Sequence, residues 1–175
     1  MKQTELKEFL DTKVDQYNRI DFIETDPIQI PKRFVQKEDI EIMAFLVATI
    51  AWGNRKSIIK SGNRIATIMG ESPFDFVMNF SENDKDRFSG FVHRTFNEVD
   101  LQCFIQALKN IYMNHGGLES VFATYSQPKT LQPAIHHFKR IFFSGPHQKR
   151  TEKHISDPAK NSAAKRINMF FHWII

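Results

Sequence analysis

Residues 38–54, EDIEIMAFLVATIAWGN, contain the stretch that decides the fold of this chain. Acidic residues fill its first turn, where a helix dipole favours negative charge, and an almost unbroken apolar run follows from Ile42 to Ala51. A helix that is apolar nearly all round lies at the centre of a soluble protein. Gly53, just after the run, tolerates the left-handed backbone with which many helices end. We therefore expect one central helix that the rest of the chain covers.

Helical periodicity continues on both sides of this segment. Further helices are expected over residues 4–18, 56–69, from 73 to 80, 97–114, 118–125, 130–144 and 162–175. Asn97 with Asp100 forms a capping-box variant before one of them, and Asp26 to Pro31 is expected to be extended because helical backbone is disfavoured before proline. No run alternates like a strand, and no Asn-Gly or Asp-Gly pair marks a hairpin. The predicted fold class is all-α.

Composition limits the function classes. A chain of 175 residues fits one domain, 1–175, and 17 Phe predict a core filled with rings. The single Cys103 excludes an internal disulfide or a cysteine-ligated cluster, and it is expected to be a buried, inert thiol. The N-terminus has no apolar signal core and no apolar run approaches the roughly 18 residues of a membrane span. We expect a cytoplasmic protein without a membrane partner.

Positive charge is concentrated late in the chain. The net charge is +4, and residues 145–166 carry six cations against two acids. The cations are Lys149, Arg150, Lys153, Lys160, Lys165 and Arg166. Such a patch is typical of polyanion binding, although a solvated basic loop fits the charge equally well.

The last helix carries the candidate for chemistry, Lys165. Ser162 is the expected N-cap, and the helix then runs to an apolar end at Ile175 with no Gly, Asn or Pro to stop it, so we expect a C-terminally truncated domain. The helix dipole and the neighbouring Arg166 should both lower the pKa of Lys165, which would free its amine to form a Schiff base. The alternative is a solvent-facing lysine on a first turn.

Two polar turns complete the candidate nucleic-acid-binding residues. Trp52, Asn54, Arg55 and Lys56 follow the central helix, where a turn could push a side chain into a base stack while its cations hold phosphate. A helix cap with Trp52 packed on a neighbour is the alternative. His93 and Arg94 form a polar island that could contact a ligand or cap the next helix. The spacing of the seven His residues and one Cys suits no zinc site, so no metal and no cofactor are predicted.

Four blocks resemble those of an uncharacterised bacterial protein family, the domain of unknown function 2400 type. The blocks are DPIQIPKRF (26–34), AWGNR (51–55), HRTFN (93–97) and SAAKRINMF (162–170). More distantly, the order of a buried helix with a polar turn, an amphipathic helix ending in a Gly pair and a late helix with a lysine resembles the helix-hairpin-helix DNA glycosylases. This resemblance implies an orthogonal multi-helix bundle.

The glycosylase resemblance also implies an activity. Those enzymes extrude a nucleotide, because the glycosidic carbon cannot be reached in an intact stack. Carried over, Lys165 would be the nucleophile, and Asn54 and Arg55 would lie near the extruded base. This chain departs from them because no Gly-x-Gly hairpin precedes Lys165 and no partner aspartate follows it, so the fragment should be weak or inactive.

Three functions therefore remain open. The first is a DNA base-excision-repair glycosylase or lyase-like protein acting through Lys165. The second is a non-catalytic nucleic-acid-binding module, and the third is a helical protein-interaction domain. The sequence leaves the oligomeric state and the choice between DNA and RNA undetermined.

Overall fold

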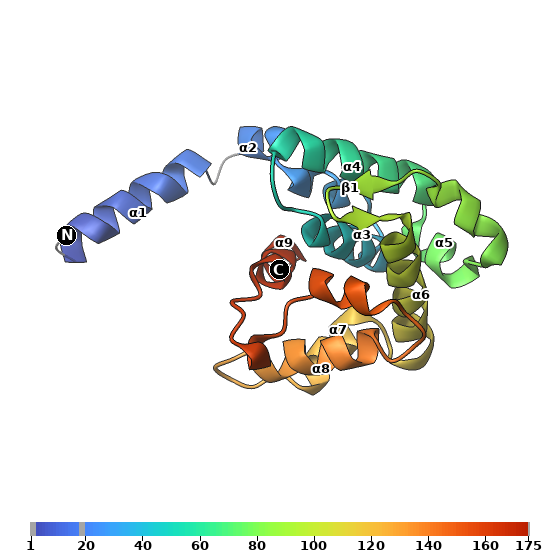
Figure 1. Cartoon of the computed structure of the whole chain (residues 1–175). Helices are drawn as coiled ribbons and strands as arrows, with labels where there is room; N and C mark the ends of the chain where they lie inside the picture. Colours follow the sequence, from blue (N-terminus) through green and yellow to red (C-terminus); the bar gives the residue numbers. More distant parts are fainter. Residues whose placement is uncertain (1–2, 18–19, 175) are drawn as a thin grey trace.

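The computed structural model of this chain describes residues 3–17 and 20–174, and the expected central helix is its organising element. Helix α3 (Lys37–Thr49) is buried from Ile42 to Thr49. Helix α9 (Lys165–Ile174) packs along it. Figure 1 places α4 (Arg55–Met69) on one side of α3 and α7 (Leu118–Thr124) with α8 (Gln132–Phe142) on the other. The all-α prediction is confirmed, since helices make up most of the described chain.

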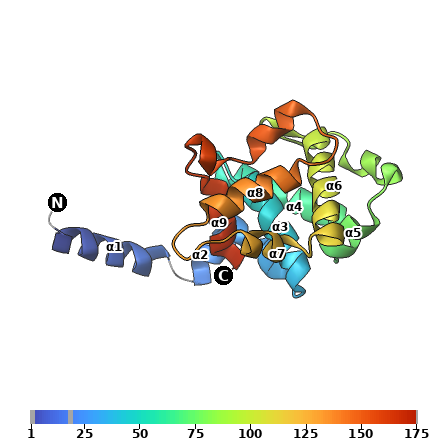
Figure 2. The same cartoon turned by 90° about the horizontal axis from the view of Figure 1, so that it is seen from below.

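Further helices complete the fold. They are α1 (Gln3–Tyr17), α2 (Ile20–Thr25), α5 (Pro73–Asn79), α6 (Glu98–Asn114), and the 3-10 helices η1 (Pro27–Gln29), η2 (Pro31–Arg33), η3 (Glu82–Phe88), η4 (Lys149–His154) and η5 (Pro158–Lys160). Asn97 caps α6 as expected, in a capping box with Asp100. In both views α1 projects away from the remaining helices (Figures 1 and 2).

Phenylalanine rings fill the core, as the composition predicts. Phe45 on α3 is fully buried at its centre. Its ring centroid lies 5.4–5.9 Å from those of Phe104, Phe138, Phe142 and Phe170. Rings at these separations, several of them edge to face, add attraction beyond the area they bury. This cluster joins α3 to α6, α8 and α9, which fixes where the last helix begins.

Two predictions about local backbone are wrong. Asp26 is extended before Pro27 as expected, but Ile30 takes a helical backbone before Pro31, and residues 27–33 fold into η1 and η2 rather than an extended connector. A strand pair also exists, since β1 (Val92–His93) and β2 (Phe96–Asn97) form a small antiparallel hairpin. Its two-residue loop begins with Arg94 at φ 56°, so the turn forms without an Asn-Gly or Asp-Gly pair.

Three other predictions need correction. Helix α9 begins at Lys165, so Ser162 is not its N-cap; the Ser162 hydroxyl accepts a hydrogen bond from the Ala164 N–H, and Ala164 has φ 45°. The basic segment 145–161 is not simply a loop, because it contains η4 and η5. Cys103 is half-buried rather than buried, and burial raises the pKa of its thiol to about 11, so it stays protonated.

Candidate functional site

The turn after α3, the hairpin and the basic segment meet around Trp52. The half-buried indole is contacted by three side chains, which with it form the Trp52 cluster: the guanidinium of Arg166 lies 4.8 Å from the ring centroid, the ring of His154 stacks at 6.0 Å, and His93 meets it edge-on at 5.2 Å. These residues come from four separate parts of the chain. The expectation that Trp52 packs on neighbouring side chains therefore holds, with an arginine among its partners.

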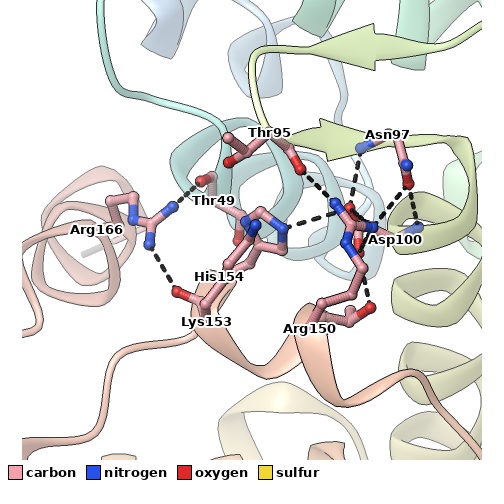
Figure 3. Close-up of polar contacts among 9 residues, drawn as sticks. Thr49, Thr95, Asn97, Asp100, Arg150, Lys153, His154 and Arg166 are labelled. Carbon is pink, nitrogen blue, oxygen red and sulfur yellow. Dashed lines mark hydrogen bonds and ion pairs between the residues drawn. The ribbon is translucent and has the colours of Figure 1, made fainter.

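Asp100 joins the basic segment to the hairpin from beneath (Figure 3). The carboxylate is fully buried and accepts hydrogen bonds from Arg150 at 2.9 and 3.0 Å and from the Thr151 hydroxyl at 2.7 Å. Arg150 also donates to the Thr95 carbonyl, 2.8 Å away in the hairpin loop. Pairing of this kind is what a buried carboxylate requires. It fixes η4 against the start of α6 and the hairpin.

His154 is the most deeply buried ring of the Trp52 cluster. Its Nε2 lies 3.3 Å from Asp100 Oδ2, within ion-pair distance but outside hydrogen-bond geometry, so among the described residues this atom lacks a hydrogen-bond partner. Burial lowers the pKa of His154 to about 4, outweighing the attraction of Asp100. Burial also lowers the pKa of His93. Both imidazoles are neutral at pH 7, and the positive charge around Trp52 comes from arginine and lysine.

Arg166 connects α9 to the turn. It donates to the Thr49 carbonyl at 2.8 Å and reaches the Lys153 carbonyl at 3.5 Å, as Figure 3 shows. Burial lowers the pKa of its guanidinium, which nevertheless remains protonated because arginine titrates far above neutral pH. The same residue thus covers Trp52 and holds η4, so the C-terminal end of α3, the basic segment and α9 are fixed together.

Further cations of the basic segment and the hairpin stay exposed near this cluster. Arg94 is exposed on the hairpin loop, and Lys153 is exposed on η4. Within residues 3–17 and 20–174 neither of them pairs with a carboxylate. Lys165 is exposed at the first residue of α9, directly before Arg166. A cavity of about 620 Å³ is lined by the residues before it, Ser162 to Ala164, and by the turn at 127–132, whereas Lys165 is not among its lining residues.

Other predicted site residues have local partners. Asn54 is the N-cap of α4 and accepts from the N–H groups of Lys56 and Ser57. Arg55 lies 3.9 Å from Asp26 and stacks over Phe22.

In the basic segment, Lys149 pairs with Glu152 at 3.0 Å, whereas Lys160 is exposed, as is Lys56 at the start of α4. Of the predicted set, the structure brings together Trp52, His93, Arg94, Arg150, Lys153 and Arg166.

The sequence reasoning missed His154 and Thr151, and it took Asp100 only as a capping acid. The one available signal for His154 was its place inside the basic segment, between two cations of the predicted patch. No group of three or more His, Cys, Asp or Glu side chains in the described part of the chain could hold a metal ion. No helix there has the length and apolar character needed to cross a bilayer.

Comparison with known proteins identifies the family of this chain. No curated protein and no solved structure matches it. Residues 26–175 match the model of a family described as a protein of unknown function, DUF2400. The match begins after α1 and α2 and includes every residue of the Trp52 cluster. Because it spans most of the chain, the chain belongs to the DUF2400 family.

Proposed function

We propose that this chain binds nucleic acid through the Trp52 surface, which we define as Trp52, Arg94, Lys153 and Arg166. The observation that carries the proposal is that Arg166 covers a half-buried indole at the place where the segments that carry two further cations, Lys153 and Arg94, meet. The guanidinium of Arg166 lies over the Trp52 ring, and it also contacts the backbone carbonyl of Lys153. The guanidinium of Arg94 lies over Gly53, the next residue of the turn.

The charges of this surface suit a polyanion. Asp100, the carboxylate nearest to the cluster in the contacts above, is fully buried and already paired with Arg150. The outward-facing groups Arg94 and Lys153 are therefore available for phosphate, whereas Arg150 serves to position η4. Phosphate contacts fix a nucleic acid on a protein and carry most of its affinity.

Salt dependence of binding tests the proposal. Fluorescence anisotropy with a labelled duplex should give a dissociation constant that rises steeply with salt. Lys153→Ala should weaken binding and flatten the log–log salt slope by about 0.9, the value for one lost phosphate contact on B-DNA. Lys85→Ala is the control, because Lys85 is on η3, away from this surface in both views (Figures 1 and 2), and pairs with Glu82.

Two results would count against nucleic-acid binding. Binding that is indifferent to salt, or equal losses from Lys153→Ala and Lys85→Ala, would remove the Trp52 surface as the contact. A partner protein that shifts the elution volume of a chain that binds no nucleic acid would instead favour a protein-interaction domain.

A second candidate function is a DNA glycosylase or lyase-like activity through Lys165. The specific observation is that this lysine is exposed and directly precedes Arg166 of the Trp52 surface. Its amine would attack the sugar carbon of an extruded nucleotide, the base would leave, and a Schiff base would form with the opened sugar.

Borohydride trapping tests this second candidate. Reduction of the Schiff base would give a stable amine that links the protein to DNA. The adduct should disappear in Lys165→Ala and persist in Lys160→Ala, a control because Lys160 is also exposed in the basic segment. If no adduct forms on a panel of damaged duplexes that the protein does bind, the chemistry is excluded and only binding remains.

A further inference from the structure

Arg94 has a backbone conformation that its residue type disfavours. It has φ 56° and begins the two-residue loop between His93 and Phe96, which pair across the hairpin. Gly suits such a position because it has no Cβ, and Asn tolerates it because its short polar side chain can hydrogen-bond locally, whereas other side chains are strained there. The hairpin thus places an arginine where asparagine would fold more easily.

The neighbouring turn leaves space for this arginine. A Cβ added to Gly53 would lie 2.3 Å from Nη1 of Arg94, so any larger residue there would displace the guanidinium. Gly53 itself has φ 102°, so two residues with left-handed backbone face each other across the gap. The Arg94 side chain therefore packs against the turn that carries Trp52.

No polar contact of the Arg94 side chain with the rest of the described chain explains why the strain is kept. Within the described residues, Arg94 makes no hydrogen bond or ion pair, whereas Arg150 bonds both Asp100 and the hairpin loop. The bracing of the hairpin is thus the work of Arg150 and not of Arg94. A strained backbone conformation that no internal hydrogen bond or ion pair stabilises is typical of a residue that contacts a ligand.

We infer that Arg94 is held in this conformation to contact a phosphate of the bound nucleic acid, next to the site where Arg166 covers Trp52. This inference rests on the proposed function and assigns its central contact. It implies that position 94 gives up folding stability for binding, because the residue type that most favours the turn is not the one that most favours phosphate binding.

Two substitutions separate backbone strain from phosphate contact. Arg94→Asn relieves the backbone and removes the guanidinium, and it should raise the melting temperature by about 2–4 °C while weakening duplex binding about tenfold or more. Arg94→Lys keeps a charge but loses the planar fork and should bind with intermediate affinity. Arg140→Ala, an exposed arginine of α8 that makes no ion pair in the described chain, should match the wild type in both measurements.

The affinity, salt slope and melting temperature of Arg94→Asn decide whether the inference holds. Weaker binding and a salt slope flatter by about 0.9, without loss of melting temperature, supports the inference. Wild-type affinity and slope in Arg94→Asn overturn it, and so does a lowered melting temperature, which would make the conformation a structural need. If the wild-type protein itself shows no salt-dependent binding, the proposed function fails as a whole, and this inference fails with it.

Discussion

At Asp100 a single carboxylate holds three segments that are distant in the chain. It bonds Asn97 in the hairpin and Arg150 and Thr151 in η4, while it belongs to the first turn of α6. A buried carboxylate left without such partners would cost several kcal/mol, so these contacts constrain one another. His154 is the ring that this arrangement encloses, and its neutral state is part of the stability of the site.

Acid should therefore destabilise the protein through His154. Its folded-state pKa of about 4 lies below the ordinary value of 6.5, so as the pH falls the unfolded chain binds the proton first. The contribution of neutral His154 to the free energy of unfolding should be at its maximum above pH 6.5. It should decrease progressively toward pH 4, by on the order of 3 kcal/mol in total. His93, whose pKa burial also lowers, should add to the same loss.

The comparison of two variants by denaturant unfolding at several pH values checks this. His154→Phe keeps a ring against Trp52 and Phe96 but does not titrate, so its stability should fall less between pH 6.5 and 4. His172→Gln, a change at an exposed position on α9, should keep the wild-type pH dependence. Identical pH curves for the wild type and His154→Phe would contradict the assignment.

The sequence predicts the roles of these residues only in part. The capping role of Asp100 follows from its spacing to Asn97, but its bonds to Arg150 and Thr151 join residues about fifty positions apart, which no local pattern reports. For the same reason the sequence favoured Lys165, which lies on a clear helix, over His154. The inward turn of Arg166 depends on where α9 crosses α3, and that crossing is set by ring packing.

Among the elements, the basic segment shows how a polar stretch becomes ordered. Lys139 on α8 donates to the carbonyls of Glu152 and Ile155 at 3.0 and 2.6 Å, and burial lowers the pKa of its amine. These bonds satisfy backbone groups at the end of η4. A lysine one helix away therefore helps to keep Lys153 at the Trp52 surface. The sequence predicts the charge of this segment but not its anchoring.

The contact between α4 and α3 depends on a small residue, Gly62. A Cβ built there would lie 2.5 Å from Cδ1 of Ile30 and 3.3 Å from Cγ2 of Val47. Gly62→Leu should push α4 away from α3 and lower the free energy of unfolding by about 1–3 kcal/mol, the usual cost of overpacking a core. Since α4 carries Ser61, which bonds His93 at 2.9 Å, the hairpin should shift as well.

Chemical denaturation checks the size of this effect. Lys60→Leu introduces the same side chain at an exposed position of the same helix and should change the stability by less than about 0.5 kcal/mol. Equal stability of Gly62→Leu and the wild type would show that α4 tolerates displacement and that the close approach is not required.

For the whole molecule, the apolar pattern was sufficient to predict the all-α class and the central helix. The central position of α3 follows from its all-round apolar surface, and the ring-filled core follows from the excess of Phe. The hairpin was not predictable, because two residues per strand leave no alternation to detect and Arg94 hides the turn. The amphipathic pattern correctly predicts that α1 is a helix, but no other element of the described chain covers the apolar face of this helix. Its side chains Leu6, Phe9, Leu10 and Val14 are 41–56 % exposed.

The region matched by the family model should therefore fold without α1. Among residues 3–16 of α1, whose side chains the structure describes, none belongs to the hydrophobic core, and the family match begins at residue 26. A chain that starts at Ile20 keeps α2, whose Phe22 contacts Arg55, and should unfold cooperatively within about 2 °C of the full chain in a thermal melt. Since the Trp52 surface lies wholly in the retained part, the nucleic-acid binding that we propose for it should be the same in the shortened chain. A broad or lowered transition in the shortened chain would mean that α1 stabilises the other helices in solution, and its exposed apolar face would then have to bind them.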